Sequence, residues 1–234
     1  MAHLVDSIDR PRENPVPVAD VRAQLKDAHA YLVELGTAAI HHIDANIPDY
    51  AWGTHMKRIR IVFPAGDRPA LISNTHETHS LIEVINQLAT MERLIDALHW
   101  AEGNLPDYGL LRCHPTTGSQ KTGESDVPDN DMVLMHPDGQ LARCEVSDVA
   151  SKKDGNGKEF KDLMSLGVRL ANMDAWPEGN PPFADRLFMI VSTEMGERIR
   201  RRMTTYYPQK QPYFSYMVAF ATPGTTMFEV IARR

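Results

Sequence analysis

Two acidic residues flank a predicted hairpin that would bring their carboxylates together. Asp131 stands at the start of an apolar run, and Glu145 lies inside a second apolar run. Between them, Asp138-Gly139 is one of the strongest short-range signals for a tight β-turn. A carboxylate inside a strand is costly to bury unless it has a partner. Two carboxylates that converge beside lysines favour a Mg²⁺ site, which is typical of phosphodiester hydrolysis.

The loop after the second apolar run has the composition of an anion-binding segment. Its sequence is Ser-Lys-Lys-Asp-Gly-Asn-Gly-Lys, from Ser151 to Lys158, and a helix is predicted to begin near Gly157. Glycines, lysines and a helix N-terminus together can bind phosphate. The segment lacks the Gly-x-x-x-x-Gly-Lys-Ser/Thr pattern, which disfavours a nucleoside triphosphate site, and the same loop fits a DNA phosphate as readily.

A purely structural interpretation of the same residues stays open. In it, Asp131 caps a strand, Glu145 pairs with Arg143 or with a lysine, and the lysine-rich loop is only a solvated surface.

The elements that would position these residues can be read from hydrophobic spacing and turn signals. Helices are predicted over 18–44, 74–101, 157–170 and 194–203. Strands are predicted over 56–63, 69–73, 109–114, 131–136, 140–149, 186–191, 211–221 and 226–233. We expect a single domain with a mixed central β-sheet flanked by helices. Its parts are a flexible arm over 1–17, an N-terminal helix and hairpin over 18–73, a core over 74–192, and a C-terminal helix and hairpin over 193–234.

The predicted helix after residue 74 has two candidate starts. Asn74 with Glu77, or Ser80 with Glu83, has the spacing of a capping box. Glu83 could alternatively send a carboxylate from this helix into the acidic site. The histidines of His76-Glu77-Thr78-His79 do not have the His-Glu-x-x-His spacing of a metalloprotease, so a cap is favoured over a metal site there.

The densest basic patch lies in the predicted helix over 194–203. It consists of Arg198, Arg200, Arg201 and Arg202. Four arginines in five positions suit contacts with nucleic-acid phosphates. The polar segment over 115–130, which contains Lys121, is long for a connection without structure of its own and is a second candidate contact.

The order helix, three strands, helix, strand around an acidic hairpin resembles the PD-(D/E)xK nuclease superfamily, which has the restriction-endonuclease-like fold. In that family Pro-Asp starts the second core strand, the (D/E)xK tripeptide lies in the third, and the preceding helix sometimes adds a carboxylate. Pro128-Asp129 is present here, and Asp131 stands directly before Met132-Val133-Leu134. The resemblance covers about 80–191. It implies metal ligands at Asp131 and Glu145, with Asp129 and Glu83 as further candidates.

One position departs from the family pattern. Glu145-Val146-Ser147 stands where the tripeptide is expected, so Ser147 replaces the lysine and can hold a water but supplies no positive charge. The resemblance implies hydrolysis with Mg²⁺, for which Mn²⁺ can substitute. Lys152, Lys153 or Lys158 would then orient the water or stabilise the transition state. Duplex DNA is the favoured substrate, and the alternative is a catalytically inactive nuclease-fold module that binds DNA or protein.

Composition sets the remaining expectations. The net charge of −6 argues against a generally basic nucleic-acid coat, although local basic contacts remain compatible with it. The two cysteines, Cys113 and Cys144, fall in predicted strands and suit buried packing in a reduced, cytoplasmic protein. Neither a signal peptide nor a membrane helix is expected. A homodimer is left open, with the N-terminal helix and the closing hairpin as candidate interfaces.

Overall fold

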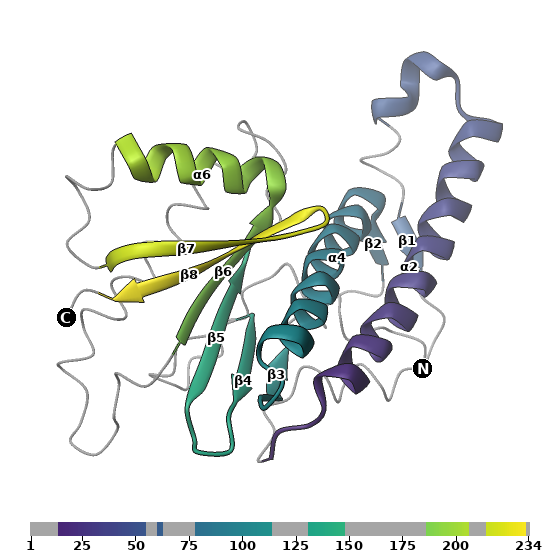
Figure 1. The fold of residues 1–234 in the computed structure, drawn as a ribbon. Coiled ribbons are helices and arrows are strands. Elements are labelled where there is room, and N and C mark those ends of the chain that lie inside the picture. Colours follow the sequence, from purple (N-terminus) through teal and green to yellow (C-terminus); the bar gives the residue numbers. More distant parts are fainter. Residues whose placement is uncertain are drawn as a thin grey trace, which may run out of the picture.

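A six-stranded mixed sheet forms the centre of the molecule (Figure 1). The computed structural model describes residues 14–54, 60–62, 78–113, 131–147, 186–205 and 214–232. Its strands lie in the order β3-β4-β5-β6-β8-β7. Their bounds are β3 (Gly109–Cys113), β4 (Met132–Met135), β5 (Leu141–Val146), β6 (Arg186–Ser192), β7 (Phe214–Thr222) and β8 (Thr225–Ala232). The predicted fold class, a mixed sheet flanked by helices, is confirmed.

The strand directions divide the sheet into two antiparallel parts joined by one parallel pair. Strands β3, β4 and β5 form an antiparallel meander, β5 pairs with β6 in parallel, and β6, β8 and β7 are again antiparallel. A parallel pair needs a crossover between its strands. The connection here comprises residues 147–185, and the helix predicted within it, over 157–170, lies outside the described residues. The strand predicted over 69–73 also lies outside them.

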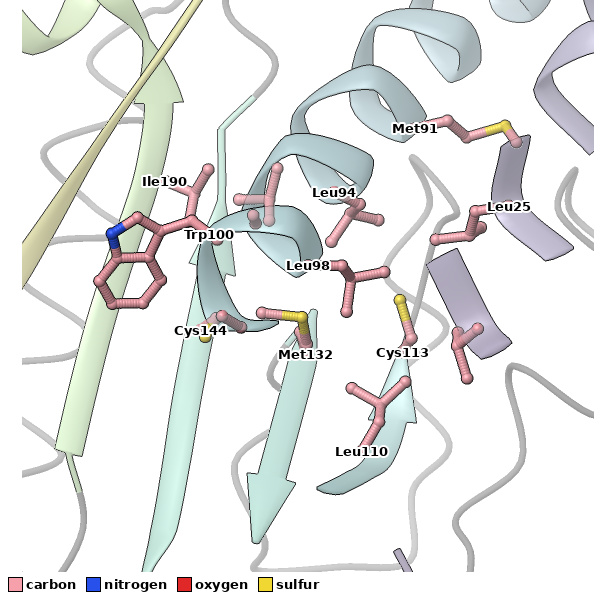
Figure 2. Packing of buried hydrophobic residues seen from close by; sticks show 14 of the residues in the cluster. Leu25, Met91, Leu94, Leu98, Trp100, Leu110, Cys113, Met132, Cys144 and Ile190 are labelled. Atoms are coloured by element: carbon pink, nitrogen blue, oxygen red, sulfur yellow. The ribbon is translucent and has the colours of Figure 1, made fainter. Parts of the chain in front are cut away.

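Two long helices pack against one face of the sheet, which we call the first face (Figure 1). They are α2 (Val18–Asn46) and α4 (Leu81–Asn104). A short 3₁₀ turn, η1 (Asp49–Ala51), follows α2. A small two-stranded sheet of β1 (Arg60–Val62) and β2 (Thr78–Ser80) precedes α4. Each helix buries an apolar stripe at three- and four-residue spacing. Figure 2 shows Leu94 and Leu98 of α4 among side chains of β3 to β5 and Leu25 of α2.

The start of α4 decides between the two predicted capping boxes. The Ser80 hydroxyl accepts the Glu83 N–H at 3.2 Å, and the Glu83 carboxylate accepts the Ser80 N–H at 2.6 Å. The alternative start at Asn74 is wrong, because Thr78–Ser80 forms β2, which pairs with β1. Local capping signals occurred twice in this segment, and tertiary pairing with β1 selected the second.

Helix α6 (Thr193–Thr205) packs on the opposite face of the sheet, which we call the second face. Its Gly196 lies so close to the buried side chain of Thr226 that an added Cβ would be 2.6 Å from the threonine Cβ. Thr226 pairs with Val191 of β6, two residues from the Met189–Phe228 pair. The buried apolar residues outside the first-face cluster are Val133, Leu187, Met189, Val191, Met195, Ile199, Phe228 and Val230.

The two edges of the sheet differ. At the β3 edge, Val16 exchanges two backbone hydrogen bonds with Leu110, at 3.0 and 2.8 Å. Gly109 permits this approach, since a Cβ there would be 2.6 Å from Pro15 Cβ. At the other edge, β7 has β8 as its only hydrogen-bonded neighbour among the described strands. No helix in the described part of the chain combines the length and apolar character that a bilayer crossing requires.

Candidate functional site

The β4–β5 hairpin has the tight turn that Asp138-Gly139 predicts. The His136 N–H donates to the Gln140 carbonyl at 2.9 Å, and Gly139 has φ +92°, which glycine adopts without strain. The Asp138 carboxylate accepts the Gln140 N–H at 2.9 Å and lies 2.7 Å from His136 Nδ1. These contacts, first Gln140 and then His136, lower the pKa of Asp138. The turn therefore fixes the register of the two strands.

The two predicted metal ligands lie just beyond the last pair of this register. Met132 pairs with Cys144, so the next residues outward along the antiparallel ladder are Asp131 and Glu145. Directly opposed residues share a face of the sheet. Glu145 also pairs with Met189, and Met189 with Phe228, so this row of residues lies on the second face.

The Asp131 carboxylate has a definite role at the end of the ladder. Its Oδ2 accepts the Val146 N–H at 2.6 Å. The next N–H along β5, that of Ser147, donates to Ile190 of β6 at 2.8 Å. Alternate N–H groups of a strand point to opposite neighbours, so the Val146 N–H points toward the β4 side, just beyond the end of β4. Asp131 thus caps the start of β4, as the structural interpretation predicted, and it follows Met132 outward along the ladder as Glu145 follows Cys144.

Ser147 follows directly after β5 and is almost completely buried, with 1% of its surface exposed. Its Oγ is a buried polar atom that has no hydrogen-bond partner among the described residues. A buried hydroxyl in this state costs free energy, so it marks a place where a water or another polar group would be stabilising. Because residues two apart in an extended segment share a face, Ser147 lies on the same side as Glu145.

Cys144, the residue before Glu145 on β5, is buried and lies within electrostatic range of both acidic residues. Burial raises its pKa most, followed by the charges of Cys113, Glu145 and Asp131. The thiol is 2% exposed and faces the apolar cluster of the first face. Cys144 and Cys113 are both free thiols buried in strands, as predicted.

The predicted basic patch lies on α6, on the second face. Its first turn has a cap, because the Ser192 hydroxyl accepts the Met195 N–H at 3.4 Å. Arg200 and Arg201 are exposed and Arg198 is half-buried, while Met195 and Ile199 of the same helix face the sheet. Arg202 also belongs to α6, but its side chain lies outside the described part. The helix therefore presents positive charge on the same side of the sheet as Asp131 and Glu145.

The other predicted site residues separate into two groups. Glu83 caps α4, as described above, and its proposed metal role stays a prediction. The remaining members fall outside the described residues: Asp129, Lys121, Lys152, Lys153 and Lys158. Within the described ranges, no group of three or more histidine, cysteine, aspartate or glutamate side chains has the arrangement of a metal site. Asp131 and Glu145 would thus be a two-carboxylate set, which suits Mg²⁺ because this ion keeps several waters and takes further oxygens from substrate phosphates.

A polar cluster at the opposite end of the strands was not predicted from the sequence. The Tyr108 hydroxyl donates to Gln140 Oε1, and Tyr108 also interacts with Arg186. Arg186 binds both carboxylate oxygens of Glu229, at 2.8 and 3.1 Å, and this raises the pKa of Arg186. The partners come from separate elements, 32 residues apart for Tyr108 and Gln140 and 43 for Arg186 and Glu229, so no local spacing signals their contact. The cluster closes the first face beside Phe188, over whose ring Arg186 lies.

Comparison with known proteins gives no relative: no family model, no curated protein and no solved structure matches the chain.

Proposed function

We propose that this protein is a Mg²⁺-dependent enzyme that hydrolyses phosphodiester bonds in DNA, with Mn²⁺ able to replace Mg²⁺. The observation that carries the proposal is the register of the β4–β5 hairpin: its pairing ends at Met132 and Cys144, and Asp131 and Glu145 are the next residues outward. Two carboxylates close together would favour a bound cation or a proton, because their charges repel each other.

The strand order supports the resemblance to PD-(D/E)xK nucleases on which the proposal draws. Helix α4 precedes a three-stranded meander, and β6 then pairs in parallel with the third strand of that meander. The aspartate precedes the second strand and the glutamate lies in the third, which are the positions that the resemblance implies.

The proposed mechanism gives each described residue one task. Asp131 and Glu145 would hold the cation, and Asp131 could do so while its Oδ2 accepts the Val146 N–H, because a carboxylate offers about four acceptor sites. The Ser147 hydroxyl holds a water beside the cation, which would satisfy its buried Oγ. When bound, the cation would supply a water of lowered pKa and would offset charge on the scissile phosphate. Arg200 and Arg201 of α6 contact neighbouring phosphates of duplex DNA.

Cleavage of supercoiled plasmid DNA tests the proposal. The wild-type protein should nick the plasmid with Mg²⁺ or Mn²⁺ and stop when EDTA is added. Glu145→Gln keeps the side-chain shape and should lower the rate by at least about a hundredfold, because the metal contributes several kcal/mol to the barrier reduction. Glu197→Gln, an exposed glutamate on α6, is the matched control and should cleave like the wild type. Equal cleavage by Glu145→Gln and the wild type would remove the site assignment.

One observation favours a second candidate, a nuclease-fold module that binds DNA without cleaving it. Ser147 stands at the position of the family lysine and is buried, so it cannot supply the positive charge that the lysine provides. For such a module, DNA binding would survive Glu145→Gln and no metal-dependent nicking would occur. The plasmid assay combined with a filter-binding assay on the same samples separates the two candidates.

A further inference from the structure

We infer that β7 is a self-association edge, along which two copies of this chain pair antiparallel and join their sheets. The proposal does not depend on the proposed function. It rests on the position of β7 in the sheet, on its composition and on its exposed side chains.

Within the described ranges, the β7 edge has few of the usual protective devices. Natural sheets blunt a terminal strand with lysine, proline, a β-bulge, a short length or a covering segment. Strand β7 has nine residues, Phe-Ser-Tyr-Met-Val-Ala-Phe-Ala-Thr, with no charge and no proline. Its one irregularity lies near the start, between Phe214 and Tyr216. The β3 edge, by contrast, is bridged by Val16.

The exposed side chains of β7 suit a second copy of the same strand. Val218, at the middle of the strand, is 39% exposed, and Ala221 is also exposed. The neighbour of Val218 on β8 is Glu229, whose charge is neutralised by Arg186. Two β7 strands centred on Val218 would therefore meet without like charges facing each other.

The charge of the rest of the molecule points to the same edge. With a net charge of −6, two copies repel each other over most orientations. An uncharged strand edge lowers this repulsion and offers backbone donors and acceptors in a self-complementary pattern. An antiparallel pair of identical strands has a two-fold axis, the commonest symmetry of protein dimers.

Sedimentation of the full chain tests the inference. The wild-type protein should have twice the single-chain mass of 26.3 kDa at micromolar concentration. Val218→Lys sets two lysines opposite each other and should weaken dimerisation at least about tenfold, while Val218→Thr should leave it unchanged. A wild-type protein that sediments as a single chain, or a Val218→Lys protein that dimerises like the wild type, overturns the inference.

Cross-linking tests the pairing of two β7 strands even if Val218→Lys fails to fold. A short bis-maleimide should link Val218→Cys to its own copy, because the two cysteines face each other at the two-fold axis. Ala221→Cys is the matched control: its copies would be about 20 Å apart, six residues along the strand, and should not be linked. The wild-type cysteines, Cys113 and Cys144, are buried and should not react. Equal linking of the two variants, or no linking of Val218→Cys, contradicts the proposed pairing.

Discussion

Neighbouring residues of β5 face two different environments. Cys144 lies in the apolar cluster between the sheet and helices α2 and α4, whereas Glu145, the next residue, lies half-buried on the second face. The first face is filled by two long helices and closed at its end by the Arg186–Glu229 pair. The second face carries α6, the two acidic residues and the buried Ser147 hydroxyl. The difference indicates that the first face supplies most of the stability, while the second face also carries polar and charged groups.

The largest effect is expected from truncating an aromatic side chain on the first face. Phe188 is completely buried, with its ring 5.2 Å from that of Trp100 in an edge-to-face arrangement. Phe188→Ala should lower the free energy of unfolding by about 4–5 kcal/mol. Phe228→Ala, at a buried phenylalanine of the second face, is the matched control. If Phe228 has no aromatic partner, Phe228→Ala should lower the free energy of unfolding by about 1 kcal/mol less than Phe188→Ala does. Urea unfolding measures both, and a larger loss for Phe228→Ala would invert the comparison.

A smaller stability effect is expected at Asp131, where a structural role and a chemical role can be separated. Asp131→Ala removes the acceptor for the Val146 N–H and should destabilise the protein by about 1.5–3 kcal/mol. Asp131→Asn keeps an oxygen acceptor and should cost less than about 1 kcal/mol, yet it loses the charge that a cation needs. The expected signature of Asp131→Asn is near-normal unfolding together with lost metal-dependent cleavage. Normal cleavage by Asp131→Asn would leave Asp131 with the structural role alone.

The arginines of α6 should affect DNA binding rather than stability. Arg200→Ala and Arg201→Ala should each weaken binding to duplex DNA severalfold and lower the salt dependence of binding by about one phosphate contact. Binding titrations at several salt concentrations measure this slope. Glu197→Ala on the same helix should not weaken binding, and a loss as large as that of Arg200→Ala would argue against a basic contact surface.

The smallest effect is expected at Asp96 of α4. Its carboxylate accepts a hydrogen bond from the Thr225 hydroxyl at 3.1 Å, and burial raises its pKa. The folded state therefore binds a proton more readily than the unfolded state, so the contribution of Asp96 to stability falls as the pH rises from the ordinary aspartate pKa through the raised one. Asp96→Asn should be more stable than the wild type at neutral pH, by less than about 0.5 kcal/mol because the group is partly exposed, and equal to it in acid. A stabilisation that persists in acid would contradict this cause.

Local signals predicted much of the fold. Apolar spacing placed α2 and the body of α4, and Asp138-Gly139 placed the hairpin turn to the residue. The hairpin register then followed from the turn, and with it the positions of Asp131 and Glu145 just beyond its last pair. The bond from Val146 to Asp131 had no sequence signal beyond the position of Asp131 before a strand. Strand β2 was missed because its three residues precede a helix and acquire their conformation from pairing with β1.

The central claim is that the two carboxylates on the second face hold one divalent cation. A crystal structure of the protein soaked with Mn²⁺ tests it most directly through the anomalous signal of the metal. The account predicts one manganese peak within about 2.5 Å of a carboxylate oxygen from both Asp131 and Glu145, and no peak there in Glu145→Gln crystals. Carboxylates that point apart, or a manganese ion bound elsewhere with none between them, would contradict it.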